Sequence, residues 1–169
     1  MHRSTTSGVA KGLHLAGWPM SPNESTMLPS GPTNQWGHWE DRELVALNDR
    51  ILNKLGAAWN DPPSLEVVIS RKDEFLPMAV NYVRSRISAH AGGQWGIKDP
   101  RLVPLWPIWK AAFDTFHDID LITVTPRRNE VAIAESLHKR DRMEISTATR
   151  LARTYHGNLD SLAVMNLLP

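Results

Sequence analysis

Residues 95–128 read WGIKDPRLVPLWPIWKAAFDTFHDIDLITVTPRR, and the predicted fold class rests on them. Residues 95–98 suit a short strand that ends at Asp99-Pro100, because a residue before proline avoids helical geometry. A helix face follows, marked by Leu102, Leu105, Trp106, Trp109 and Phe113. Residues 119–124 are rich in β-forming side chains, and a helix is expected from about 129 to 140. The alternation of strand and helix predicts an α/β fold with a parallel sheet flanked by helices.

The remainder of the chain is predicted to add helices and one long loop. Apolar residues at helical spacing predict a helix over 8–16, after a hydroxyl-rich entry. Residues 18–39 contain several prolines and favour a long irregular loop of the kind that often forms a lid or a binding site. Helices are expected over 40–55 and over 70–89, the second with a kink at Pro77.

Length and composition are those of an ordinary globular domain. The 169 residues include 41% hydrophobic and 22% charged side chains, which excludes a disordered chain and a coiled coil. The formal net charge is +1, so the chain has no general attraction for nucleic acid or an anionic membrane. It contains no cysteine, and its first residues lack the apolar core of a signal peptide. We therefore expect residues 1–169 to form a single cytoplasmic domain that binds neither nucleic acid nor a membrane.

Three polar clusters fall where an α/β fold would place a ligand. They are residues 3–7 before the first helix, residues 98–101 after one expected strand, and Arg127 with Arg128 after the other. A helix N-terminus presents unpaired N–H groups and a partial positive charge, so the Arg-Ser-Thr-Thr-Ser entry suits a phosphate. Ser and Thr are also common helix N-caps, and arginine is common on surfaces. The residues alone leave both interpretations open.

Metal and P-loop kinase chemistry are not expected. The chain has seven histidines, but no two of them lie three to five residues apart, as a local zinc pair requires. A kinase-type P-loop ends in Gly-Lys followed by Ser or Thr, and the sequence lacks this ending.

Four strings, in order along the chain, resemble the bacterial sulfotransferases that use 3′-phosphoadenosine 5′-phosphosulfate (PAPS). They are HRSTTS at 2–7, GHWEDRE at 37–43 with LND at 47–49, WGIKDPR at 95–101, and Arg128-Asn129 with Ser136-Leu137 and KRD at 139–141. The Lys-Asp-Pro string is also similar to that of the tyrosylprotein sulfotransferases. The resemblance implies a P-loop-like fold, with PAPS as the sulfuryl donor and no metal.

The resemblance also implies where PAPS would lie. The family loop that wraps the 5′-phosphosulfate corresponds here to Arg3, Ser4, Thr5, Thr6 and Ser7. Of these, Arg3, Thr6 and Ser7 would meet the phosphate and sulfonate oxygens. The arginine and serine that hold the 3′-phosphate in the family match Arg128 and Ser136. Arg128 suits that role because a guanidinium group binds phosphate with two hydrogen bonds.

Lys98 is the candidate to stabilise charge on the sulfuryl group or the bridging oxygen. One further group must take the acceptor's proton, and Glu40 is the first candidate because it opens a helix after the long loop. Asp41 and Asp99 are its rivals. Acids in a first helical turn also stabilise the helix dipole without a catalytic role, and Asp99 could simply cap the helix after it. The resemblance implies that the acceptor is a hydroxyl or amine. In the family, this group usually belongs to a carbohydrate or small metabolite.

Two departures from the family matter. Relatives have glycine where this chain has Thr5, and glycine permits the positive φ of a phosphate loop, which costs a β-branched residue about 1–3 kcal/mol. The family loop also follows a hydrophobic strand, whereas only Met1 precedes His2. Relatives continue past the equivalent of Leu137 through further helices and usually another strand, whereas this chain stops at Pro169. The comparison predicts a chain shortened at both ends, with an incomplete sheet. The alternative function is a catalytically inactive paralogue that acts as a nucleotide-binding or interaction module.

Overall fold

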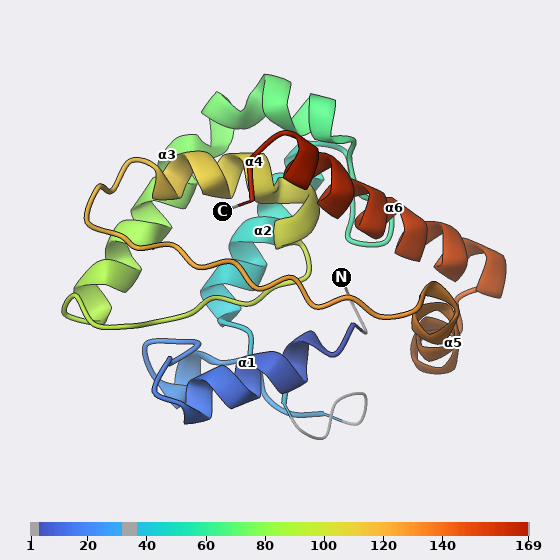
Figure 1. Cartoon of the computed structure of the whole chain (residues 1–169), viewed down its shortest axis with the longest axis horizontal. Coiled ribbons are helices and arrows are strands. Elements are labelled where there is room, and N and C mark those ends of the chain that lie inside the picture. Colours follow the sequence, from blue (N-terminus) through green and yellow to red (C-terminus); the bar gives the residue numbers. More distant parts are fainter. Residues whose placement is uncertain (1–3, 32–36, 169) are drawn as a thin grey trace.

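The computed structural model describes residues 4–31 and 37–168, and its regular structure is helical (Figure 1). The elements are α1 (Thr6–Leu15), the short 3-10 helix η1 (Glu24–Thr26), α2 (Arg42–Lys54), α3 (Leu65–Ala89), α4 (Leu102–Phe113), α5 (Glu130–Asp141) and α6 (Ile145–Val164). Among these residues strand pairing is limited to isolated bridges, Met27 with Asp41 and Ala58 with Asp61. None of these helices is long and apolar enough to cross a membrane.

The predicted α/β fold is wrong, because the described residues form no P-loop-like parallel sheet. The two expected strands fall in the segments 93–99 and 119–129, which have no ladder of backbone hydrogen bonds in the described chain. The Gly96 N–H does bond to the Pro19 carbonyl, at 3.0 Å. A strand is stabilised by the hydrogen bonds of its neighbours. A β-rich sequence without a paired neighbour therefore remains an extended connection.

The helices that the sequence predicts are confirmed, most of them with small shifts at their ends. Their capping residues explain where they begin. Asp41 Oδ1 accepts the Glu43 N–H at 2.8 Å at the start of α2, and Asn129 Oδ1 accepts the Val131 N–H at 2.9 Å at the start of α5. These side chains satisfy N–H groups that the first helical turn leaves without partners. Helix α6 was not predicted.

Helix α3 begins before the predicted residue 70 and is the longest of these helices. Ser64 is its N-cap, and the Val67 N–H donates to the Ser64 Oγ at 3.4 Å. Pro77 lies inside the helix, where it removes a backbone donor and crowds the preceding turn. Figure 1 shows α3 bending between its two halves, in agreement with the predicted kink. The bent helix packs against both α2 and α4.

The core divides into two clusters of buried side chains. The larger cluster is built from α2, α3 and α4, and Leu162 of α6 joins it. The smaller cluster lies between α5 and α6. Its buried members are Ile133, Ala134, Leu137, Ala148, Leu151, Ala152 and Tyr155. Helix α6 therefore belongs to both clusters and holds the α5–α6 hairpin against the rest of the molecule.

Helix α1 lies on the opposite side of the extended segments from α4 and α6. In Figure 1 the segments 93–99 and 119–129 cross the molecule between α1 and these two helices. Side chains from α1, α4, α6 and both segments line one cavity of about 680 Å³. The extended connections therefore border an internal space instead of pairing with one another.

Candidate functional site

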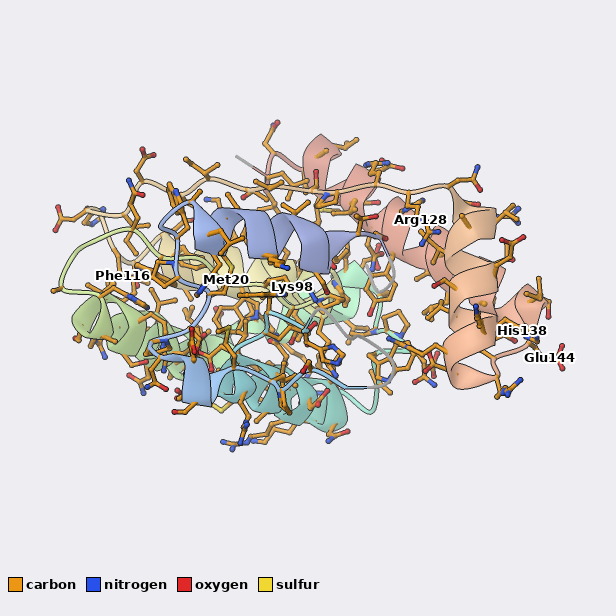
Figure 2. The ribbon with its side chains drawn as sticks, turned by 90° about the horizontal axis from the view of Figure 1, so that it is seen from below. Met20, Lys98, Phe116, Arg128, His138 and Glu144 are labelled. Carbon is orange, nitrogen blue, oxygen red and sulfur yellow. The ribbon has the colours of Figure 1, made fainter. Side chains whose placement is uncertain are left out.

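Lys98 stands at the centre of a polar cluster that joins three separate parts of the chain. Its Nζ donates to the His38 carbonyl at 3.2 Å and to the Ser7 Oγ at 3.4 Å. It also forms an ion pair with the Glu40 carboxylate. Figure 2 shows Lys98 close to α1, the helix whose first turn contains Ser7. The structure thus brings together Ser7, Glu40 and Lys98, all of them candidate site residues.

The pair of Lys98 and Glu40 is shielded from solvent, with side chains only 11% and 7% exposed. Burial raises the pKa of the Glu40 carboxyl above its ordinary value; the Lys98 charge opposes this effect, and the nearby Asp99 adds to it. A buried carboxylate loses hydration that one ion pair does not fully replace. Glu40 therefore holds its proton closer to neutral pH than an exposed glutamate does, which is a common property of catalytic acids and bases.

The loop before α1 places hydroxyl groups near this cluster. Ser4 is fully buried, and its Oγ has no hydrogen-bond partner among the described residues. Thr5 precedes the helix with φ 67° and ψ 9°, a left-handed conformation that strains a β-branched residue. Thr5 thus adopts the positive φ that a glycine at this position would permit. Ser7 Oγ donates to the His38 carbonyl at 3.4 Å and so holds the loop against the segment before α2.

Arg3 lies outside the described residues. Thr6 is the first residue of α1 and lines the 680 Å³ cavity together with Lys98. The other two residues predicted to bind PAPS lie elsewhere. Figure 2 shows Arg128 beside α5 and apart from Lys98, and Ser136 is half-buried within α5. The structure therefore groups Arg128 and Ser136 with α5.

Asp41, a rival of Glu40 for the role of base, is part of a structural network. Its Oδ1 caps α2, while its Oδ2 accepts from Tyr82 Oη at 3.0 Å and from Arg86 Nη1 at 2.5 Å. The side chain is fully buried. Burial, together with the Asp41 charge, raises the pKa of Tyr82. Both carboxylate oxygens of Asp41 therefore have partners within the fold.

Asp99, the second rival, binds the start of α4 and links it to α2. Its Oδ1 accepts from the Arg101 backbone N–H at 2.9 Å and from Arg101 Nη1 at 3.0 Å. Its Oδ2 accepts from Asn48 Nδ2 at 2.9 Å. The Asn48 Oδ1 in turn accepts from the Trp109 indole N–H at 2.9 Å. This arrangement favours the structural interpretation of Asp99.

The sequence analysis missed the basic partners of these two carboxylates. Arg86 is buried near the end of α3, and Arg101 binds the Asp99 carboxylate. A partial signal existed for Arg101, because it directly follows Asp99-Pro100. No local pattern indicates that the His38 carbonyl accepts from Lys98, since that bond joins residues 60 positions apart. Contacts of this range depend on the tertiary fold.

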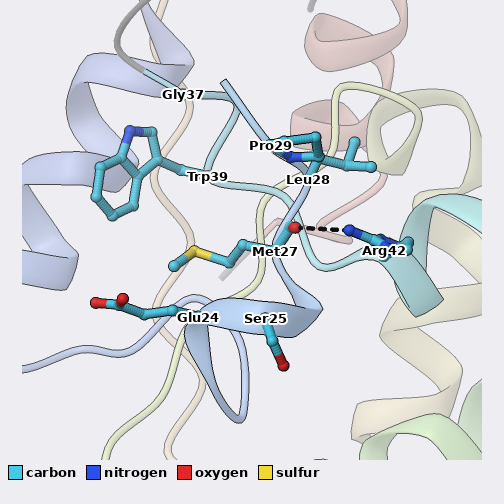
Figure 3. Close-up of a pocket in the computed structure, with 8 residues that line it drawn as sticks. All are labelled: Glu24, Ser25, Met27, Leu28, Pro29, Gly37, Trp39 and Arg42. Carbon is cyan, nitrogen blue, oxygen red and sulfur yellow. Dashed lines mark hydrogen bonds between the residues drawn. The ribbon is translucent and has the colours of Figure 1, made fainter. Parts of the chain in front are cut away.

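A second pocket, of about 450 Å³, opens beside the start of α2 (Figure 3). Its lining includes the indole of Trp39, the side chain of Met27 and the carboxylate of Glu24. Arg42 Nη2 donates to the Met27 carbonyl at 3.4 Å on one side of it. Trp39 directly precedes Glu40 in the chain, so this pocket adjoins the segment that carries the buried carboxyl.

The comparisons with known proteins identify no relative of this chain. No family model matches it, and neither a curated protein nor a solved structure matches it. In the described part of the chain no three His, Asp or Glu side chains are grouped so that they could hold a metal ion. Lys98 and the groups around it are therefore the features of the molecule that point to a function.

Proposed function

We propose that this protein is a sulfotransferase that moves a sulfuryl group from PAPS to a hydroxyl or amine of a carbohydrate or small metabolite. The observation that carries the proposal is the contact of Lys98 with both Ser7 and Glu40. This contact gathers a cation, a hydroxyl-rich helix entry and a carboxyl of raised pKa around one point. Transfer of an anionic group to a hydroxyl requires charge stabilisation and a proton acceptor, which these groups can supply.

The residues around Lys98 and those at the start of α1 fit an anionic phosphosulfate. Ser4 Oγ is buried and lacks a partner among the described residues, and the N-terminus of α1 offers backbone N–H groups. A lysine ammonium has three N–H donors. Those of Lys98 are shared among Glu40, His38 and Ser7, and the contact with Ser7 is long, at 3.4 Å. A sulfonate oxygen can replace that weak contact with a charge-assisted hydrogen bond.

The transfer step gives Glu40 the role of base. The acceptor atom forms a bond to sulfur while the bond between sulfur and the bridging phosphate oxygen breaks, which releases adenosine 3′,5′-bisphosphate. The acceptor's proton passes to the Glu40 carboxylate. Lys98 stabilises the negative charge that develops on the bridging oxygen. Asp41 and Asp99 are not given the role of base because structural partners hold their oxygens.

The pocket of Figure 3 is the proposed acceptor site. The Trp39 indole supplies an apolar surface, and Glu24 and Arg42 supply hydrogen-bonding groups. A mainly apolar pocket with a few polar groups is typical of small-molecule sites. Trp39 in its lining is followed in the chain by Glu40, the proposed base.

The alternative function is a nucleotide-binding or interaction module without catalytic activity, and two observations favour it. The left-handed conformation of Thr5 strains the loop that would hold the phosphosulfate. The ion pair of Lys98 with Glu40 also neutralises the charge that an anion would meet. A module of this kind would bind adenosine 3′,5′-bisphosphate but would not transfer a sulfuryl group.

The first experiment measures nucleotide binding. Adenosine 3′,5′-bisphosphate at 100 times its dissociation constant adds about 2.7 kcal/mol to the unfolding free energy, which is a shift of about 5–10 °C in the melting temperature for this size. Thermal melts with and without the nucleotide measure this shift. The absence of any shift at millimolar nucleotide would exclude both the sulfotransferase and the nucleotide-binding module.

The second experiment measures transfer from radiolabelled PAPS to a panel of sugars and small hydroxyl compounds. We expect Lys98→Ala to lower the rate about 10²- to 10³-fold, because it removes the group that stabilises the developing charge. Lys72→Ala is the matched control, since Lys72 is an exposed lysine paired with Asp73, and its rate should equal that of the wild type. Nucleotide binding without transfer by the wild type would support the inactive module instead.

A further inference from the structure

The lining of the cavity of about 680 Å³ includes Thr6 and Lys98, but its two broad walls are apolar and play no part in the proposed transfer. Helix α1 forms one wall through side chains that include Val9 and Leu13. Helices α4 and α6 form the other, with Trp106 and Leu162 among the side chains. The volume far exceeds the ~30 Å³ of one water molecule and falls within the range of about 300–1,000 Å³ for ligand sites. A matching occupant is apolar on both faces.

One narrow side of the cavity is the extended segment 118–126. Its side chains alternate as in a strand, since Leu121 and Thr123 are half-buried whereas Ile122 and Val124 are 65% and 55% exposed. No backbone hydrogen bond joins residues 120–126 to another part of the described chain. Thr123 Oγ1 is buried and has no partner there either. The segment is therefore a strand edge without a neighbour.

The opposite narrow side is the segment 92–100, which runs in the same direction as 118–126 (Figure 1). The Gly96 N–H bonds to the Pro19 carbonyl. Along an extended chain, successive residues direct their backbone groups to opposite edges. The backbone N–H and C=O groups of Trp95 and Ile97 therefore point to the edge of the segment that faces away from Pro19. Both residues line the cavity.

We propose that this cavity is the docking site of an extended, apolar strand of a separate partner protein. The strand exchanges backbone hydrogen bonds with Trp95 and Ile97 on one side and with residues 119–125 on the other. Its side chains contact the two helical walls. In strand addition of this kind, main-chain hydrogen bonds give affinity and the side-chain pockets give selectivity. A compact apolar ligand fills the same space but leaves both rows of backbone groups without partners.

The residues of this sequence that the structure does not describe are too short to be the occupant. They are 1–3, 32–36 and 169. An extended chain rises about 3.3 Å per residue, so residues 1–3 reach about 10 Å, whereas residues 119–125 extend over about 23 Å. Residues 32–36 are also fixed at both ends, between Gly31 and Gly37. A strand that fills the cavity therefore comes from another polypeptide segment.

The test uses the peptide acetyl-KKVIVIVK-amide, whose lysines keep an apolar strand in solution, and the same peptide with N-methyl groups on alternate residues. We expect the unmodified peptide to bind with one copy per chain and to slow hydrogen exchange at Trp95, Ile97 and alternate residues of 119–125. N-methylation preserves the apolar surface but removes backbone donors, so affinity should fall at least about tenfold, or about 1.4 kcal/mol. Isothermal calorimetry and amide exchange measure the two effects.

Two variants of one residue separate backbone pairing from side-chain contact. Thr123→Pro removes the backbone N–H of an extended residue and should weaken peptide binding, whereas Thr123→Val keeps that N–H and should bind as the wild type does. Circular dichroism checks that both variants are folded. Equal binding of the two peptides, protection of other amides, or no binding at millimolar peptide would overturn the proposal. Self-association of the chain with the same amides protected would also overturn it, because the occupant would then be a second copy.

Discussion

The carboxyl of Glu40 lies in a buried pair with Lys98, and its chemistry depends on which of two opposing effects is larger. Burial disfavours the ionised carboxylate, and the lysine charge favours it. The pKa of Glu40 is raised, so burial is the larger effect. Glu43, an exposed acid in the first turn of α2, experiences no comparable loss of hydration. The cluster around Lys98 therefore singles out Glu40 as the carboxyl suited to accept a proton.

The raised pKa of Glu40 predicts how stability depends on pH. The ionised carboxyl destabilises the folded state, so the unfolding free energy should rise as the pH falls through the raised pKa toward the ordinary value of 4.5. Urea denaturation of the wild type and of Glu40→Gln at each pH measures this effect, because the variant lacks this titration. The wild type should gain stability relative to the variant on acidification. A loss instead would mean that pairing with Lys98 outweighs burial.

At the scale of elements, a buried network joins the start of α2 to the end of α3. Arg86 binds Asp41 at 2.5 Å and also pairs with Glu43, and its guanidinium lies 4.7 Å from the ring centre of Tyr82. The side chains of Arg86 and Asp41 are 8% and 0% exposed. A buried pair of this kind fixes how two elements meet, because either partner alone would be a buried, uncompensated charge.

Arg86→Leu should lower the unfolding free energy by about 3–5 kcal/mol, because it leaves the Asp41 carboxylate buried with only Tyr82 as a side-chain partner. Arg84→Leu, an exposed position on the same helix, should change it by less than about 0.5 kcal/mol. Urea denaturation measures both. Adding Asp41→Asn to Arg86→Leu should recover part of the loss. A cost below about 1 kcal/mol for Arg86→Leu would show that the network contributes little.

The sequence was sufficient to predict most of the helices, but not whether the extended segments pair into a sheet. The helices could be predicted because periodic leucines and capping residues such as Asp41 are local signals. The resemblance placed Ser7, Lys98 and Arg128 around one ligand. Ser7 and Lys98 do meet, but Arg128 lies apart from Lys98 (Figure 2). The sheet could not be predicted correctly, because residues 119–124 carry the composition of a strand but composition does not supply a neighbouring strand. The arginine partners of Asp41 and Asp99 depend on tertiary contacts that no local pattern contains.

At the scale of the whole molecule, the two clusters share α6, and this connection predicts how the molecule unfolds. Leu137→Ala in the α5–α6 cluster should cost about 2–5 kcal/mol, since Leu137 is fully buried. Val131→Ala on the same helix, where the side chain is 59% exposed, should cost less than about 0.5 kcal/mol. Denaturation followed by tryptophan fluorescence and by circular dichroism should give coincident transitions for both variants.

Separate transitions for the two probes would show that the α5–α6 hairpin unfolds independently of the larger cluster. The expectation of one transition rests on α6, because Leu162 packs with α2, α3 and α4 while Tyr155 packs with α5 and donates to the Trp59 carbonyl at 2.8 Å. Melting one end of a continuous helix removes contacts that stabilise its other end.

Because α5 packs on α6, its position in the fold depends little on the covalent link before it, the segment 119–129. A protease cut within 119–129 would leave α5 attached through its packing on α6, and the two fragments would stay together until a denaturant separated them. Insertions in that link, as between well-anchored elements generally, cost little chain entropy. The stability of the fold should therefore depend less on the length of this link than on the packing of the helix that follows.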